Sequence, residues 1–289
     1  MTHAKWHFRP HPRFDTYSTR TAMPEAGGEL FAVDEWGSDS GFVEKAWRRH
    51  SEPEPAFISI AASHWQIVVT TRRDLTQLTV RGPETRATLT AIPADAEFFG
   101  IVFSLGTFMP AMPLARLVDR AVTLPAATPS SFWLDGSRWE VPTPTNADVF
   151  VDRLVRQGVL VRDQTVAESF QADADGVFMR TLQRRVARAT GLTRSSIRQI
   201  ARAEKAVEAL GRGVSPPDAA LLLGYADQAH LIRSLKRFIR QTPAQVVKGG
   251  GHWSVSSPLS QARLVMGSCR FPSTQRLSPH VGSLPCEGS

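Results

Sequence analysis

Two clusters of basic and amide side chains have the residue types and the spacing needed to bind nucleic acid. Most members of each cluster recur every three or four positions, so a helix would place them on neighbouring parts of its surface. Arginine can donate paired hydrogen bonds to guanine or to phosphate, and glutamine can pair with adenine. The candidates are Arg180, Thr181, Gln183, Arg184 and Arg188 in the first cluster and Gln228, His230, Arg233, Ser234 and Arg237 in the second.

The positive charge of the chain is concentrated around these clusters. The 289 residues have a formal net charge of +7. Residues 179–248 contain 14 Lys and Arg against 4 Asp and Glu, whereas residues 1–178 contain 17 against 22. A basic block beside a mildly acidic body is typical of a nucleic-acid-binding region joined to a second region. An ordinary solvated helix face would instead mix both signs.

Residues 215–238 predict two helices around a glycine turn. Ser215 can cap the first helix, Gly224 can end it, and Asp227 can cap the second. The second helix would have an inner face of Leu231, Leu235 and Phe238, with Gln228, Arg233, Lys236 and Arg237 on its other faces. A short helix, a turn and a basic amphipathic helix are the parts that let one helix enter a major groove while the other braces it.

An upstream segment predicts a second, less regular unit of the same kind. It comprises a helix at residues 165–170, a turn at residues 173–176 and a basic helix that starts near Arg180 and closes at Gly191. Its inner face would be Leu182, Val186 and Ala189. A helix over residues 195–210 would join the two units. At 1.5 Å per residue it spans about 24 Å, which suits two recognition helices on one side of DNA.

The N-terminal half of the chain predicts short β-strands. The short β-rich runs lie at residues 57–60, 65–70, 77–81, 85–90 and 99–103, and polar and apolar residues alternate in several of them, as in an antiparallel sheet or a small barrel. We expect a helical turn at residues 114–118 and a loop carrying an aromatic cluster at residues 132–139. The side chains of Trp65, Trp133 and Trp139 are expected in the core. Residues 98–115 lack charge, but Pro110 and Pro113 exclude a membrane helix.

These patterns predict an α+β chain in which an antiparallel, β-rich, barrel-like domain precedes an all-α domain with two helix-turn-helix units. The expected boundaries are a flexible arm at residues 1–28, a β-rich sensor or dimerisation domain at 29–145, a connecting helix at 146–164, the double helix-turn-helix domain at 165–248 and a disordered tail at 249–289. The side chain of Asn146 is expected to cap the connecting helix.

The C-terminal block resembles the DNA-binding domain of the AraC/XylS family of bacterial transcription regulators. The resemblance rests on residues 180–185, 189–193, 224–230 and 238–245, which stand in the family's order and spacing. Stretches 78–85 and 98–103 are similar to the β-rich sensor domain of some relatives. The resemblance implies that both recognition helices contact successive major grooves of double-stranded DNA, that the domain contacts RNA polymerase, and that a companion domain senses a small-molecule effector or forms a homodimer.

The chain departs from the family pattern at a few positions. Phe178 precedes the first recognition helix where the family usually has Ser, and the turn before it is longer. Ala229, Leu231 and Arg240 replace the usual Ser, Phe and Gly. These changes are expected to loosen the first unit and to alter the second recognition helix.

Several residues have two readings. His230 is either a base contact or a side chain packed on the scaffold, and we leave both open. Arg233 and Arg237 are expected to contact phosphates because they lie within the basic block. Glu204 and Glu208 are expected to form surface pairs with neighbours such as Lys205 or Arg212.

An enzyme fused to the helix-turn-helix module is the main alternative function. The only cysteines are Cys269 and Cys286 in the tail, so the folded part has no thiol nucleophile and no cysteine metal site. His3, His7 and His11 have helical spacing, but the intervening prolines make a helical metal site improbable. We therefore predict a non-enzymatic, cytoplasmic regulator with no cofactor, metal or membrane partner. A helical module that binds a protein in place of DNA is the other alternative.

Overall fold

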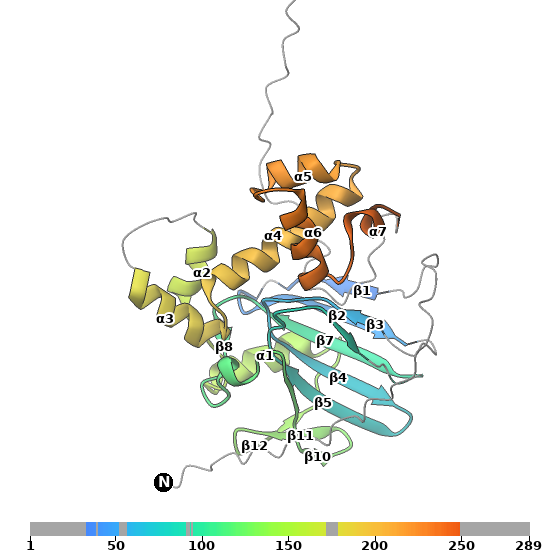
Figure 1. The fold of residues 1–289 in the computed structure, drawn as a ribbon. Helices are drawn as coiled ribbons and strands as arrows, with labels where there is room; N and C mark the ends of the chain where they lie inside the picture. Colours follow the sequence, from blue (N-terminus) through green and yellow to red (C-terminus); the bar gives the residue numbers. More distant parts are fainter. Residues whose placement is uncertain are drawn as a thin grey trace, which may run out of the picture. The chain divides into compact units, whose positions relative to one another are not determined.

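The computed structural model describes residues 33–38, 40–51, 57–90, 93, 95–171 and 179–248. The expected arm at residues 1–28, the tail with both cysteines, the turn at residues 173–176 and Phe178 lie outside the described residues. Within them, antiparallel strands precede a helical region, as the sequence predicted (Figure 1). No helix of this part of the chain has the length and apolar character required to cross a membrane.

The β region is built on a six-stranded antiparallel sheet. Its strand order is β1 (Val33–Trp36), β2 (Val43–His50), β7 (Glu97–Phe103), β4 (Gln66–Arg72), β5 (Leu75–Arg81) and β9 (Ala121–Thr123). Both faces of the sheet are covered. Ile67 and Val69 of β4 point into the main core, whereas Val68 joins Trp47 and Val102 in a second apolar cluster on the other face. Burial on both faces explains why the run at residues 67–69 is continuously apolar.

Three smaller sheets complete the β region. They are β10 (Ala126–Thr128), β11 (Ser131–Leu134) and β12 (Ser137–Glu140), the pair β3 (Phe57–Ser59) with β6 (Thr88–Thr90), and the pair β8 (Thr107–Phe108) with β13 (Val161–Arg162). A 3-10 helix, η1 (Leu114–Arg116), occupies the predicted helical turn.

The prediction of a loop at residues 132–139 was wrong, because this segment is the hairpin of β11 and β12. Asp135 and Gly136 both have positive φ, at 49° and 74°, which is the geometry of a tight two-residue hairpin turn. The hairpin places Trp139 in the core at 1% exposure and leaves Trp133 at 45% exposure on the opposite face. The expectation that Trp133 is buried was therefore wrong, whereas Trp65 and Trp139 are core residues.

The helical region contains six helices after the connecting helix α1 (Ala147–Arg156), counted over the described residues. They are α2 (Gln164–Gln171), α3 (Met179–Thr190), α4 (Arg194–Gly211), α5 (Pro216–Leu222), α6 (Gln228–Phe238) and α7 (Pro243–Lys248). The predicted caps of α5 and α6 are present, since Ser215 accepts from the backbone N–H of Asp218 and Asp227 accepts from that of His230. The predicted side-chain cap of α1 is absent, because Asn146 Oδ1 accepts instead from the backbone N–H of Thr143 at 2.7 Å.

One cluster of buried apolar side chains extends from the inner face of the sheet to the inner faces of the helices. The helix α4 supplies Ile197, Ile200, Ala206 and Leu210 to it, and α6 supplies Leu231, Leu235 and Phe238, all at the helical spacing predicted from the sequence. The helical region is thus packed on the β region through a shared core.

Candidate nucleic-acid interface

Helix α6 presents a basic face on the side away from its buried residues. Leu231, Leu235 and Phe238 are buried, while Arg233 and Arg237 are exposed on other faces. Lys236 is exposed three positions after Arg233 and lies on the same face of the helix. Lys236 was not among the DNA-contacting residues predicted from the sequence, although it lies three positions after Arg233, which is helical spacing. Gln228, at the first turn of α6, is also exposed.

His230 and Ser234 make contacts within the chain that hold α6 against the turn after α5. His230 Nδ1 accepts from the backbone N–H of Ala226 at 3.4 Å, and its ring stands edge-on to Tyr225 at 5.2 Å between centroids. The hydroxyl groups of Tyr225 and Ser234 are 3.2 Å apart. Burial raises the pKa of Tyr225, so the phenol stays protonated and available for this hydrogen bond. The geometry thus favours the scaffold role for His230, one of the two readings left open by the sequence.

The same turn is fixed from the side of α4. The guanidinium of Arg202 lies 4.7 Å from the centroid of the Tyr225 ring and donates to the carbonyl oxygen of Gly224 at 3.1 Å. Gly224 has a φ of +68°, which a residue with a side chain adopts at a cost. These contacts set the angle between α5 and α6.

Helix α3 carries the first cluster on its exposed side. The side chains of Val186 and Ala189 are buried and that of Leu182 is partly buried, as predicted. The exposed side chains are Arg180, Thr181, Gln183, Arg184 and Arg188. The structure therefore places every residue of the first cluster at the surface of one helix.

Arg188 differs from the other members of this cluster. Its guanidinium lies 5.6 Å from the centroid of the Phe108 ring in β8. A cation over an aromatic face is held there by the ring's quadrupole. Arg188 thus also links the end of α3 to the β region.

Asp163 joins α2 to α3. Its carboxylate accepts from the backbone N–H of Val166 at 3.1 Å, which caps α2, and from the guanidinium of Arg185 at 3.0 Å and 2.8 Å. The hydrogen bond from Arg185 is the main reason that the pKa of Asp163 lies below its usual value. One side chain therefore orients both helices of the first unit.

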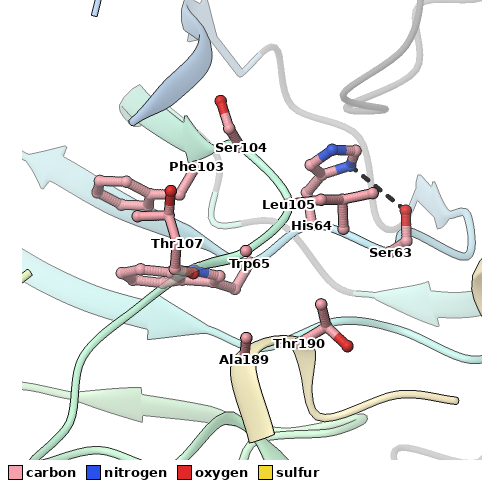
Figure 2. A pocket seen from close by; sticks show the side chains of 10 residues that line it. Ser63, His64, Trp65, Phe103, Ser104, Leu105, Thr107, Ala189 and Thr190 are labelled. Atoms are coloured by element: carbon pink, nitrogen blue, oxygen red, sulfur yellow. Dashed lines mark hydrogen bonds between the residues drawn. The ribbon is translucent and has the colours of Figure 1, made fainter. Parts of the chain in front are cut away.

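The last turn of α3 is anchored in a small pocket of the β region (Figure 2). Ala189 and Thr190 line this pocket together with Trp65, whose ring stacks on Phe103 at 4.1 Å and whose Nε1 donates to the carbonyl oxygen of Thr107 at 2.7 Å. The pocket is thus a packing joint.

His64 lies in the same pocket and is buried. Its Nδ1 is 3.4 Å from the hydroxyl of Ser63. Burial and, to a lesser degree, the nearby Lys45 lower the pKa of His64 to about 4. The imidazole is therefore neutral at neutral pH, and it does not add charge to the joint.

Helix α4 carries a buried carboxyl group, that of Glu204, on the side that faces Lys45 of the β region. Glu204 is 9% exposed, and its Oε1 has no hydrogen-bond partner among the described residues. Burial and, to a lesser degree, the neighbouring Glu208 raise the pKa of Glu204 to about 8, with Lys45 of β2 acting in the opposite direction. Lys45 is itself buried and forms an ion pair of 2.7 Å with Glu35. The expectation that Glu204 forms a surface pair was therefore wrong.

A second cavity lies within the β region. It has a volume of about 380 Å³ and is lined by side chains of the main sheet, among them Val69, Thr71 and Phe99, and by residues 129–130 and 140–144. Apolar surface predominates, and Arg48, Glu97 and Glu140 supply charge. Volumes of this size hold small organic molecules in other proteins.

Comparison with known proteins identifies the helical region. Residues 171–249 match the family model of a helix-turn-helix domain. A search of curated proteins finds no match. Among solved structures, an apo ToxT variant from Vibrio cholerae is similar over 78% of this chain and 99% of that chain, with 7% sequence identity and a TM-score of 0.33. The assignment of residues 171–249 accordingly stands on the family model.

Proposed function

We propose that this chain regulates transcription by binding promoter DNA with α3 and α6 in successive major grooves. Residues 171–249 match the family model of a helix-turn-helix domain, which supports DNA as the partner. One observation carries the proposal. Two helices with exposed basic faces, α3 and α6, each come after a shorter helix in the chain, and both are packed on the single helix α4. This is the arrangement that presents two recognition helices to one duplex.

The length of α4 is comparable to the distance between successive major grooves on one side of a DNA duplex. Its 18 residues span about 27 Å at 1.5 Å per residue. Successive major grooves on one side of a duplex are about 34 Å apart. Arg184 of α3 and Arg233 of α6 are both exposed.

Base recognition is assigned to the residues at the exposed faces. We propose base or backbone contacts for Arg180, Thr181, Gln183, Arg184 and Arg188 of α3 and for Gln228, Arg233 and Arg237 of α6. His230 and Ser234 were also candidates for DNA contact, and their bonds to the α5–α6 turn support a positioning role for both. Lys236 joins the proposed contacts because it shares the face of Arg233.

Regulation is assigned to the β region. We propose that it senses a small-molecule effector, dimerises, or does both, and that the bound protein contacts RNA polymerase in the cytoplasm. The cavity of about 380 Å³ supports effector binding, since its size and mixed lining suit a small organic molecule. A regulator of this kind needs no catalysis of its own.

Fluorescence anisotropy of the full chain on duplex DNA tests the proposal. Several phosphate contacts predict a binding constant that falls steeply with salt, with a slope of about −0.9 per contact in a plot of log K against log salt. Selection from random duplexes should return a motif with two half-sites about one helical turn apart.

Two results would count against this function. A folded chain that binds no duplex even at low salt would favour the protein-interaction alternative. Turnover of a substrate by the β region would favour an enzyme joined to the module.

A further inference from the structure

Two loops of the β region cap the C-terminal end of the second recognition helix. The backbone N–H of Ala61 donates to the carbonyl oxygen of Phe238 at 2.8 Å, and the backbone N–H of Ala87 donates to that of Arg237 at 2.9 Å. The last carbonyls of a helix have no partner within the helix and need one elsewhere. The β region supplies it here, so the end of α6 is fixed to these loops.

The residue before Ala87 is an exposed arginine. Arg86 therefore lies beside the end of α6, where Lys236, Arg237 and Arg240 are exposed as well. We name these four residues the basic edge. It continues the cationic face of α6 onto the β region, although the chain up to residue 178 carries more acidic than basic residues.

Glu84, in the loop of Arg86, and Asp119, which contacts this loop, are engaged in other bonds. Glu84 accepts from Arg81 at 2.7 Å and from the hydroxyl of Ser59 at 2.8 Å. Asp119 accepts from the backbone N–H and from the hydroxyl of Thr85, each at 2.7 Å. These bonds hold the loop in place, while the side chain of Arg86 remains exposed to solvent.

We propose that Arg86 binds a phosphate of the DNA backbone beside the groove that α6 enters, so that the β region forms part of the DNA interface. The proposal rests on the proposed function. A guanidinium next to a recognition helix is suited to a phosphate because it can donate two parallel hydrogen bonds. Such a contact adds affinity and fixes the position of the protein without reading sequence.

The test compares full-length variants by anisotropy over a range of salt concentrations. Arg86→Gln should weaken binding by about three- to tenfold near physiological salt and reduce the steepness of the salt dependence by about 0.9. Arg86→Lys should restore most of the slope because it keeps the charge. Arg138→Gln is the matched control, since Arg138 is an exposed arginine of β12 and should leave both quantities unchanged.

The motif selected from random duplexes should be the same for Arg86→Gln and for the wild type. Affinity and slope that match the wild type would overturn the phosphate contact while leaving the proposed function intact. A changed motif would overturn it in favour of base reading. A wild-type chain that binds no duplex would instead reject the proposed function, and this inference with it.

Discussion

Gly191 ends α3 directly against the backbone of Leu114. A Cβ atom at position 191 would stand 2.7 Å from the carbonyl carbon of Leu114 and 2.8 Å from its carbonyl oxygen. The glycine also has a φ of +73°. Helix α3 is therefore joined to η1 by a contact that leaves no room for a side chain at position 191.

Gly191→Ala should destabilise the protein by roughly 3 kcal/mol, since it adds a steric clash to the 1–2 kcal/mol of left-handed backbone strain. Gly224→Ala is the matched control, because Gly224 has a similar φ of +68° but nothing within 4 Å of the added Cβ. Gly224→Ala should lower stability only by the roughly 1–2 kcal/mol of left-handed backbone strain. Urea unfolding of both variants measures the difference, and equal losses would contradict the close contact at Leu114.

Asp163→Ala should lower stability by about 1 kcal/mol through loss of the cap on α2. It should also weaken DNA binding, because Arg185 on α3 loses its partner. Asp163→Asn separates the two effects, since the amide oxygen can still cap α2 but no longer carries charge. Asp152→Ala, at an exposed position of α1, serves as the control in denaturation and anisotropy measurements. If Asp163→Ala bound DNA as tightly as this control, Asp163 would not orient α3.

The pKa of Asp163 also predicts a pH effect. A carboxyl whose pKa is lowered by folding stabilises the folded state above its unfolded value of about 3.8, and the contribution disappears as the pH falls through the lower folded value. The wild type should therefore lose stability in acid more steeply than Asp163→Asn. Parallel acid denaturation curves for the two proteins would contradict this.

The buried carboxyl of Glu204 predicts that the stability of the fold decreases as the pH rises, the opposite of the effect of Asp163. Its pKa is raised from 4.5 to about 8, so the folded state holds a proton that the unfolded state releases. The resulting stability is highest below pH 4.5 and is lost as the pH rises through 8. Between pH 7 and pH 9 the wild type should lose stability on the order of 1 kcal/mol from this group.

Glu204→Gln should remove this loss, because the amide resembles the protonated carboxyl and does not titrate. Glu208→Gln, at the exposed acidic neighbour on the same helix, is the control and should keep most of the pH dependence. Thermal unfolding across this pH range provides the measurement. If the stability of Glu204→Gln fell with pH as steeply as that of the wild type, the titrating group would be a residue other than Glu204.

Arg184→Ala and Arg233→Ala should each weaken binding to the selected duplex by about 1–3 kcal/mol if the side chains read bases. Selection with each variant should then relax the motif in one half-site only. Lys205→Ala, at an exposed position of α4, is expected to bind normally. If both arginine variants bound with unchanged affinity and selected an unchanged motif, neither arginine would contact the DNA. Weaker binding with an unchanged motif would indicate contacts to the DNA backbone.

The helices of the second unit could be predicted closely because their signals are local. Ser215 and Asp227 cap helices that start at the next residue, and Gly224 lies in the turn between them. The backbone at Arg240 has a conformation that favours glycine. The resemblance noted in the sequence implied a Gly at this position, and Arg240 has a φ of +63°.

Burial that depends on distant strands could not be predicted in the same way. Glu204 has a surface-like sequence context, but β2 brings Lys45 beside it from far along the chain. The exposure of Trp133 follows from the hairpin turn at Asp135 and Gly136, which decides the face to which each tryptophan points. The Asp-Gly pair was a usable turn signal that the aromatic residues around it obscured.

Arg86 was missed as a candidate for a related reason. Nothing in residues 82–87 indicates a neighbour, and the loop gains its place beside α6 only through the bond between Ala87 and Arg237. The basic residues of α6 could be recognised from periodicity alone, because one helix carries them.

The two bonds that tie the β region to the end of α6 are made by peptide groups. Any amino acid except proline brings the same N–H donor to position 87. A substitution at position 87 can therefore change the side chain and keep the hydrogen bond to the carbonyl oxygen of Arg237. Two halves of a regulator can in this way stay mechanically coupled over evolutionary time without leaving a pair of co-varying residues as a trace.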